Sequence, residues 1–332
     1  MENPAPEGVA ALPRSLVGHC LYCGERSFNE LIEGVEDFYF GNVAGNFTLR
    51  RCAHCRSLWL ADPLSADALP QAYARYYTHE DIDNAPGESG GVRGWIRHGH
   101  IARRYGGSHR LGALVGHVLY TRLAPDRQAL DARYRFAPPA PARLLDYGCG
   151  GGDYLRQMRD LGYEVTGVEQ DPECVARLEA HDIPLHQPGE IEAGKLSEWF
   201  DFVTLNHVIE HLPEPGAVLQ RIASWMKPGA RLFIETPNAE AEGLERFGRY
   251  WRGLEAPRHL SVPSMAGLRR VLEQAGLQVE RQVVRRSIRR WLWQETLAAI
   301  PKEASNAHLC EQGAEQTTAN AEFITLIARK PA

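Results

Sequence analysis

The stretch HVIEHLPEP contains the residues of this sequence whose types and spacing most directly suggest chemistry. It places His207, Glu210 and His211 in the H-x-x-E-H order of an inverted zinc-protease motif. A zinc motif of this kind must lie within a longer helix, which presents both histidines on one face. Pro213 and Pro215 follow almost at once, and proline disrupts a helix interior. We therefore expect these residues to serve a chemistry other than proteolysis.

Four of the seven cysteines form two C-x2-C pairs, in CLYCGERSF and LRRCAHCRSLWL. They are Cys20, Cys23, Cys52 and Cys55. Two thiolates on each of two tight turns can close a tetrahedral Zn²⁺ shell, which leaves no open position, so the predicted metal is structural. The alternative is four reduced cysteines without a metal, but the paired spacing favours a zinc ribbon over residues 16–62. His54, between two of the ligands, is interpreted as a bystander.

A glycine-rich unit, RLLDYGCGGGDYLRQMRDLGYEVTGVEQDP, begins at Arg143. It predicts a buried strand, a tight turn, a helix and a second strand, which together are typical of a nucleotide-binding site. Asp146 lies at the end of the first strand, where like-charge repulsion disfavours a pyrophosphate. Glu169 ends the second strand, where its carboxylate can accept ribose hydroxyls. A cationic adenosine derivative without phosphate, S-adenosylmethionine, therefore fits better than a nicotinamide dinucleotide, whose fingerprint requires a glycine at Asp153.

With these residues, and with FDFVTLNHVIEHL and AEFITLIARK, the chain resembles the class I S-adenosylmethionine-dependent methyltransferases over residues 141–332. The resemblance implies an α/β fold with a Rossmann-like, seven-stranded and mostly parallel sheet, with helices on both faces. EFITLIARK is the candidate for the one antiparallel strand near the end. The implied cofactor-binding residues are Asp146, Gly148, Gly150, Gly152, Glu169, Gln170, Asn206 and His207.

The long segment AEAEGLERFGRYWRGLEAPRHLSVPS resembles a subgroup that joins a four-cysteine zinc domain to this fold, including deoxysugar C-methyltransferases from antibiotic pathways. The resemblance implies that His259 is a catalytic base and that His211 is a second catalytic histidine. It also implies an active-site tyrosine, either Tyr76 or Tyr77; we assign Tyr76 to catalysis and Tyr77 to substrate contact. Arg258 stands where those enzymes have an acid, so carbon methylation does not follow from the resemblance.

The same segment supplies the other candidate substrate contacts. They are Trp251, Arg252, Glu255 and Arg258. The two arginines either clamp a phosphate or carboxylate of the substrate or pair with the glutamates of the segment itself. His259 is either the base or a brace bonded to Glu255 or to a backbone carbonyl. Glu210 and His211 each have a structural alternative as well.

Residues 63–140 are predicted to form a helical linker or lid between the zinc ribbon and the methyltransferase domain. Residues 89–125 contain several arginines and no acidic residue. The stretch RQVVRRSIRRWLWQE, residues 281–295, is also basic and predicts a strand and a surface helix. Both stretches are interpreted as solvated faces, with contact to an anionic substrate or to anionic lipid as the alternative.

Composition limits the remaining possibilities. Hydrophobic residues make up 44% of the chain, and the net charge is −5, which argues against a nucleic-acid partner. No apolar run reaches the roughly 18 residues of a membrane span. Residues 1–15 are rich in proline and alanine, lack the regions of a signal peptide and are expected to be a flexible tail. The expected location is the cytoplasm.

The predicted function is methyl transfer from S-adenosylmethionine to a small molecule. We favour O-methylation of a sugar, a polysaccharide precursor or a secondary metabolite, with a histidine as general base. The alternatives are a C- or N-methyltransferase acting on a nucleotide-linked sugar and a non-catalytic cofactor-binding module. The expected partner is a small acceptor, with an anionic nucleotide- or lipid-linked form left open. Peripheral membrane contact is less favoured, and the sequence predicts no oligomeric state.

Overall fold

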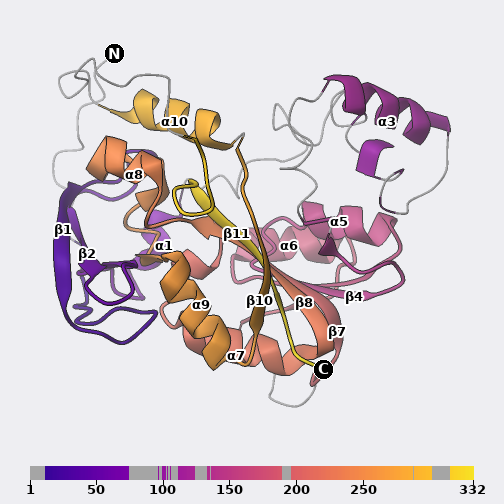
Figure 1. The fold of residues 1–332 in the computed structure, drawn as a ribbon, viewed down its shortest axis with the longest axis horizontal. Helices are drawn as coiled ribbons and strands as arrows, with labels where there is room; N and C mark the ends of the chain where they lie inside the picture. Colours follow the sequence, from indigo (N-terminus) through magenta and orange to yellow (C-terminus); the bar gives the residue numbers. More distant parts are fainter. Residues whose placement is uncertain are drawn as a thin grey trace.

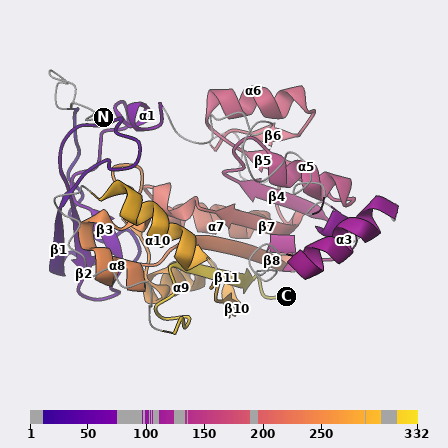
Figure 2. The same ribbon diagram turned by 90° about the horizontal axis from the view of Figure 1, so that it is seen from above.

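The protein is described by a computed structural model that covers residues 12–74, 96, 99–101, 103, 105, 111–123, 133–134, 136–188, 196–286, 288–300 and 315–332. Two β-sheets organise this part of the chain, one with seven strands and one with four. The four-stranded sheet and the helix α3 (Leu111–Leu123) lie at opposite ends of the molecule in both views (Figures 1 and 2). None of the helices in the described segments is long and apolar enough to cross a membrane.

The seven-stranded sheet has the order β10-β11-β8-β7-β4-β5-β6. Its strands are β4 (Arg143–Tyr147), β5 (Glu164–Val168), β6 (Leu185–His186), β7 (Phe200–Asn206), β8 (Met226–Pro237), β10 (Gln278–Val283) and β11 (Phe323–Arg329). Strands β4 to β8 pair in parallel, whereas β11 runs antiparallel to both of its neighbours. The predicted α/β sheet is confirmed, and EFITLIARK supplies its antiparallel strand.

Helices cover both faces of this sheet because its strands are apolar on both sides. Leu144 and Leu145 are both fully buried, but they belong to different cores. Leu144 packs with α5 (Asp153–Asp160) and α6 (Pro172–Ala180). Leu145 packs with α7 (Pro215–Trp225) and α9 (Met265–Gln274). This alternation follows from the two-residue period of a strand, and it fixes the sheet as the central layer.

The four-stranded sheet has the order β1-β2-β3-β9, with antiparallel pairing throughout. Three of its strands come from the cysteine-rich segment: β1 (Phe28–Val35), β2 (Phe47–Cys52) and β3 (Leu58–Leu60). The fourth, β9 (Ser261–Val262), follows the long segment after β8, and it pairs Val262 with Leu58. A strand from late in the chain therefore completes the sheet of the cysteine-rich segment. The predicted domain boundaries themselves stay a prediction.

The core of β1, β2 and β3 also includes apolar side chains of helices. These helices are α1 (Leu69–Ala72), α8 (Glu242–Phe247), η5 (Arg252–Leu254) and α10 (Ile288–Ala299). The short helix η4 (Gly248–Tyr250) lies between α8 and η5 in the sequence. The strand and helix predicted for residues 281–295 are confirmed as β10 and α10. In the predicted linker, Ile101 and Tyr134 pack against α5, whereas α3 exposes Leu114, Val115 and Val118.

Candidate functional site

The glycine turn after β4 requires glycine for two separate reasons. Gly148, Gly150 and Gly152 have φ angles of 74°, 53° and 82°, in the left-handed region that favours glycine. A Cβ atom on Gly148 would lie 2.5 Å from Cγ2 of Val208, and one on Gly152 would overlap Leu178. The turn is thus packed so closely between β7 and α6 that a side chain cannot enter. Because the glycines carry no side chains, a ligand at the carboxyl edge of the sheet can approach the backbone of the turn directly.

Two carboxylates flank this turn, as predicted. Asp146 is buried and accepts a hydrogen bond of 2.5 Å from Oγ1 of Thr204. Burial raises the pKa of Asp146 to about 6, and the negative charge of Glu169 adds to that effect. Oε2 of Glu169 accepts from N of Gly150 at 2.8 Å, and Oε1 accepts from N of Gln170 and N of Asp171. A carboxylate has about four acceptor positions, so a ribose would find one open position or would displace the Gly150 bond. We call Asp146, Glu169 and the glycine turn the cofactor site.

Arg133 is a charged residue of this site that sequence reasoning missed. Its guanidinium lies 4.5 Å from the ring centroid of Tyr154, at the start of α5. Burial alone would lower the pKa of Arg133, but the charges around it, of which Asp146 has the largest effect, together outweigh burial and raise the pKa. Arg133 lies in the predicted linker, in the stretch DARYRF, where no spacing or motif connects it with Asp146. It gives the cofactor site a cation that could meet the carboxylate end of an amino acid.

The H-x-x-E-H stretch does not form a protease helix. After β7, only the three residues of η3 (Ile209–His211) are helical, and α7 begins at Pro215. His207 has a φ of 57°, and this left-handed conformation turns the chain at the end of the sheet. Two histidines of a zinc protease would need one continuous helical face. The expectation that no longer helix carries both histidines is confirmed.

The imidazole of His207 lies between two buried glutamates. Its Nδ1 is 3.4 Å from Oε1 of Glu210, and its Nε2 is 3.5 Å from Oε1 of Glu235. Burial would lower the pKa of His207, but the two carboxylates outweigh burial and raise it to about 9. Val208, not His207, contacts the glycine turn. Cofactor binding by His207, Asn206 and Gln170 stays a prediction.

His211 and His259 come together from distant parts of the chain, and we call them the histidine pair. Their ring centroids are 4.7 Å apart, with the planes at 78°. Nδ1 of His259 lies 2.9 Å from the carbonyl oxygen of Gly253, and Nδ1 of His211 lies 3.1 Å from that of Arg258. A carbonyl can only accept, so each Nδ1 carries the proton in the neutral ring and each Nε2 holds the lone pair.

The surroundings keep both rings neutral. Burial lowers the pKa of His211, although the charge of Glu210 acts in the opposite direction. Burial, together with the neighbouring His211, lowers the pKa of His259 well below its ordinary value. A neutral imidazole with a fixed Nδ1 proton can take a proton at Nε2. The arrangement therefore suits proton abstraction, with Glu210 close enough to stabilise the positive charge that results.

Among the described residues, Tyr73 is a tyrosine that reaches this pair. Its hydroxyl lies 3.0 Å from Nδ1 of His211, at the end of α1. Tyr76 and Tyr77, the predicted active-site tyrosines, lie outside the described residues. Tyr73 belongs to the same aromatic stretch, YARYY, so the signal was present in the sequence. Spacing alone gave no basis for choosing among the three.

The predicted substrate contacts between residues 251 and 258 are engaged within the protein. Trp251 is buried and donates from Nε1 to Oε2 of Glu322 at 2.8 Å. Arg252 pairs with Glu255. Arg258 is fully buried and contacts Glu255 at 3.2 Å. Of the two alternatives for these arginines, the structure shows pairing with the loop's own glutamate, because Glu255 lies between them.

Among the residues that the structure describes, two groups of side chains have the geometry to hold a metal. The first is the set of four cysteines, whose Sγ atoms all lie within 4.8 Å of one another. Cys20 and Cys55 are 3.5 Å apart at sulfur, and Cys23 and Cys52 are 3.4 Å apart. Zinc–sulfur bonds of about 2.3 Å in a tetrahedron require sulfur atoms roughly 3.8 Å apart, so the cluster fits with small adjustments.

The second group consists of Glu210, His211 and His259, whose ligand atoms also lie within 4.8 Å of one another. Here the carboxylate of Glu210 already has partners within the protein. Oε1 of Glu210 faces His207 at 3.4 Å, and Oε2 accepts from Oγ1 of Thr236 at 2.9 Å. We therefore interpret this group as part of the proton-transfer site rather than as a metal centre.

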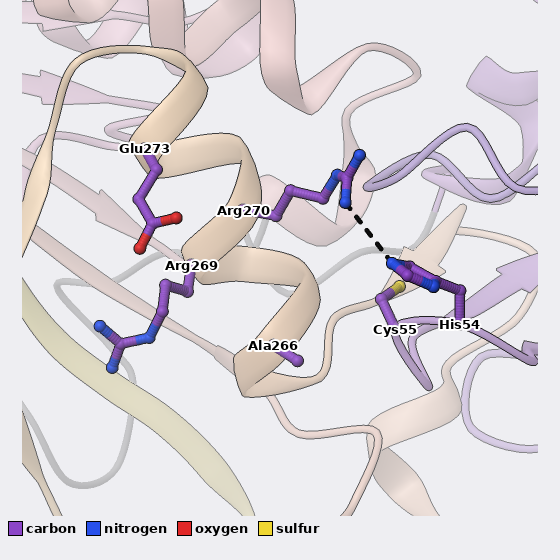
Figure 3. A pocket seen from close by; sticks show the side chains of 6 residues that line it. All are labelled: His54, Cys55, Ala266, Arg269, Arg270 and Glu273. Carbon is purple, nitrogen blue, oxygen red and sulfur yellow. Dashed lines mark hydrogen bonds between the residues drawn. The ribbon is translucent and has the colours of Figure 1, made fainter.

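An open groove of about 280 Å³ lies beside the second cysteine turn (Figure 3). It is lined by His54, Cys55, Ala266, Arg269, Arg270 and Glu273. Nη1 of Arg270 approaches Nε2 of His54 at 3.5 Å across it. The lining contains no residue of the cofactor site or of the histidine pair. The groove therefore belongs to the packing of α9 on the cysteine turn and not to the predicted chemistry.

Residues 120–282 match a family model described as a methyltransferase domain. The chain contains a methyltransferase domain. Together with the strand order and the antiparallel β11, this match confirms the predicted class I fold, whose members use S-adenosylmethionine. The residues of the cofactor site lie inside the matched range, whereas the four cysteines and Tyr73 lie outside it.

Several curated proteins are similar to part of this chain. The ubiquinone biosynthesis O-methyltransferase of Xanthomonas axonopodis pv. citri (strain 306) is 40% identical over 107 residues, which cover 30% of this chain and 45% of that protein. The protein of the same name from Aeromonas salmonicida (strain A449) is 38% identical over 103 residues, which cover 29% of this chain and 43% of that protein. The chain spans less than half the length of these relatives.

Solved structures are also similar to the methyltransferase domain. A SAM-dependent methyltransferase from Archaeoglobus fulgidus aligns with a TM-score of 0.41 at 23% identity, over 60% of this chain and 91% of that chain. A methyltransferase from Mesorhizobium loti aligns with a TM-score of 0.41 at 14% identity, over 57% of this chain and 91% of that chain.

Proposed function

We propose that this protein is an S-adenosylmethionine-dependent O-methyltransferase that acts on a hydroxyl group of a small molecule. The observation that carries the proposal is the histidine pair, in which each Nδ1 faces a carbonyl and each Nε2 holds a lone pair. The methyltransferase domain supports the transfer of a methyl group. The curated relatives are named O-methyltransferases, which supports oxygen as the accepting atom.

S-adenosylmethionine, when bound, supplies a methyl group on a positively charged sulfur for direct transfer to a nucleophile. The residues of the protein position the charged groups of the cofactor site. Asp146 gives the cofactor site a carboxylate for a cationic ligand, and Arg133 faces it with a positive charge. Glu169 ties the glycine turn to β5 through the amide of Gly150. These groups bind and orient, which supplies a large share of the rate in such transfers.

His259 is the proposed base. A hydroxyl that receives a methyl group must lose its proton, and Nε2 of His259 is the lone pair directed away from Gly253. The low pKa of His259 keeps the ring unprotonated at neutral pH, so it is ready to accept that proton. Glu210 and His211 lie within 4.8 Å and stabilise the resulting charge. The general base contributes roughly 10²- to 10⁴-fold in such reactions.

We further propose that the four cysteines hold one structural Zn²⁺. The two cysteine turns are alike: Gly24 follows the first and Arg56 the second, each with a left-handed φ. N of Cys55 also donates to Sγ of Cys52 at 3.4 Å, which holds the second turn in shape. A metal bound by four cysteines has no open position, so its role is to hold β2 and β3 in register.

The substitution His259→Ala tests the base. We expect kcat to fall by about 10²-fold or more, because the hydroxyl proton then has no acceptor. The affinity for S-adenosylmethionine, measured by calorimetry, should change by less than about threefold, because His259 does not belong to the cofactor site. Acceptors would be found by incubating a panel of phenols, sugars and nucleotide-linked sugars with labelled cofactor. Undiminished turnover in His259→Ala would exclude His259 as the base.

A further inference from the structure

Arg258 joins three segments that are distant in the sequence. It is fully buried, and its guanidinium makes an ion pair with Asp37, in the loop between β1 and β2. Nη2 donates to Oδ1 of Asp37 at 2.5 Å, and Nη1 donates to Oδ2 at 3.2 Å. Nη1 also donates to the carbonyl of Ala72 at 3.0 Å, and Nε donates to Oε1 of Glu255 at 3.2 Å. One side chain thus ties the cysteine-rich segment, α1 and the segment after η5 together.

Each of these attachments is next to a group of the proposed proton-transfer site. The carbonyl oxygen of Arg258 is the partner of Nδ1 of His211, and the next residue along the chain is His259. Ala72 precedes Tyr73, whose hydroxyl is the other partner of His211. Moving the guanidinium would therefore displace both histidines and the tyrosine together.

Asp37 is itself held firmly on its own side. Its Oδ2 accepts from N of Asn42 at 2.8 Å and from N of Val43 at 3.3 Å. The side chain of Asn42 then donates to the carbonyl of Ala72 at 2.9 Å, the carbonyl that Arg258 also contacts. The carboxylate is consequently a rigid anchor rather than a mobile surface group.

The backbone provides a second connection along the same path. N of Leu60, in β3, donates to the carbonyl of Leu260 at 2.8 Å, and N of Leu260 donates to the carbonyl of Glu210 at 2.9 Å. Leu260 follows His259, so the cysteine-rich sheet, the base and the η3 segment form one hydrogen-bonded ladder. The ladder fixes the position of the main chain beside His259, and the ion pair of Arg258 fixes the orientation of the same segment.

We propose that Asp37 and Arg258 are a positioning pair, which holds His211, His259 and Tyr73 at the mutual distances that methyl transfer requires. The pair does not bind the acceptor, because Arg258 has no exposed surface and its donors contact groups of the protein. A planar guanidinium can contact all of these acceptors at once, whereas a lysine ammonium is a point charge. This inference rests on the proposed function of the histidine pair.

The experiment compares Asp37→Asn and Arg258→Lys with a matched control. Glu240→Gln removes another ion pair between the cysteine-rich segment and the segment after β8, the 2.9 Å contact of Arg56 with Glu240. That pair is partly exposed and touches no group of the proton-transfer site. We expect kcat of Asp37→Asn to fall by about tenfold to hundredfold, because a displacement of about 1 Å can cost that much. KM for S-adenosylmethionine should stay within about twofold, and Glu240→Gln should behave as the unmodified protein.

A second readout does not depend on turnover. Two-bond ¹H–¹⁵N spectra of protein labelled at histidine report which ring nitrogen carries the proton. The signals of the histidine pair would be assigned with His211→Gln and His259→Gln. We expect Asp37→Asn to shift the Nδ1 signals of both rings, and the signals of the exposed His54 to stay in place.

Three outcomes are decisive. A folded Asp37→Asn variant with kcat within twofold and unmoved histidine signals would overturn the positioning pair. Loss of zinc or of cofactor binding in both Asp37→Asn and Arg258→Lys would also overturn it, since the ion pair would then be a general element of the fold. If the unmodified protein transfers no methyl group but its histidine signals move in Asp37→Asn, the proposed function fails and the positioning pair stands.

Discussion

The cofactor site and the histidine pair lie at the same edge of one sheet but are built in different ways. Asp146, the glycine turn and Glu169 come from a single stretch of sequence, and β4, β5 and the turn between them place all of these groups. The histidine pair depends on segments that contain Asp37, Tyr73, His211 and His259. The four-stranded sheet and the Arg258 contacts help to bring those segments together.

This difference in construction indicates which substitutions should impair each site. A site encoded by neighbouring residues keeps its geometry as long as its own strand, turn and helix are folded. A site assembled from distant segments requires every segment to be in place, because each one contributes a single contact. The cysteine-rich segment therefore supports acceptor chemistry without contributing to cofactor binding. Substitutions can separate the two sites on this basis.

The largest difference between the effects on the two sites is expected from Cys52→Ser, which removes one of the four thiolates. A structural zinc site contributes folding free energy, so its loss should unfold the sheet that β9 completes. We expect bound zinc to disappear and kcat to fall by more than about hundredfold. The affinity for S-adenosylmethionine should fall much less than kcat, because the groups of the cofactor site come from β4, β5 and the turn between them. Elemental analysis, turnover and calorimetry measure the three quantities.

Cys310→Ser is the control, since Cys310 belongs to neither C-x2-C pair. It should keep full zinc content and full turnover. Should Cys52→Ser lose cofactor affinity to the same extent as turnover, the two sites would not be separable, and the contrast between them would be wrong. Retention of zinc by Cys52→Ser would instead remove the four-cysteine metal site.

The same contrast explains what could be predicted from the sequence. Arg143–Tyr147, the glycine turn and Glu164–Val168 were predictable because period, turn residues and spacing all act within one short segment. His211 and His259 entered through a family resemblance, and the structure brings them together. The contact of the Tyr73 hydroxyl with His211 could not be predicted from the sequence, because it depends on how α1 packs against a segment more than a hundred positions away.

Arg258 shows a second reason why the role of a residue could not be predicted from the sequence. From sequence, an arginine beside a base could equally contact a substrate or another part of the protein. Its partner Asp37 lies in a loop of the cysteine-rich segment, and no pattern relates the two positions. The cation at Arg133 was missed for the same reason, since its relation to Asp146 is electrostatic and long-range. Contacts between segments, rather than residue types, decide these roles.

A change of pH should also affect the two sites differently, but less strongly than Cys52→Ser does. It should weaken cofactor binding more than it affects the histidine pair, which is the reverse of the effect of Cys52→Ser. The pKa of Asp146 is raised to about 6, and a cationic ligand binds its ionised form. The affinity for S-adenosylmethionine is therefore complete above about pH 6 and should fall by about tenfold per pH unit below it. Arg133 and Glu169 are the charged groups that face Asp146, and their effects on its pKa oppose one another.

The histidine pair should not follow this profile. The pKa values of His211 and His259 both lie below the ordinary 6.5, and that of the proposed base, His259, lies well below it. We expect kcat at saturating cofactor to fall only at a lower pH than a free imidazole base would give. Asp146→Asn should bind the cofactor more weakly with no dependence on pH, as calorimetry at several pH values would measure. A steep affinity profile in Asp146→Asn would assign the titration to another group.

The smallest expected effect comes from Tyr73→Phe, which removes one contact of the histidine pair and leaves the rest. The hydroxyl makes one hydrogen bond with Nδ1 of His211, at 3.0 Å, and the carbonyl of Arg258 still holds that ring. A neutral hydrogen bond contributes about 0.5–1.5 kcal/mol, which corresponds to a fall in kcat of roughly twofold to tenfold. Steady-state kinetics at saturating cofactor would measure it.

Tyr39→Phe is the matched control for that substitution. The hydroxyl of Tyr39 donates to the carbonyl of Tyr250 at 2.9 Å, so it also links the cysteine-rich segment to the segment after β8. It has no contact with the histidine pair, so its loss should lower thermal stability slightly and leave kcat unchanged. Equal losses of kcat in both variants would mean that Tyr73 acts only through the joint between the segments. A loss confined to Tyr73→Phe would place its hydroxyl in the proton-transfer site, beside the two histidines.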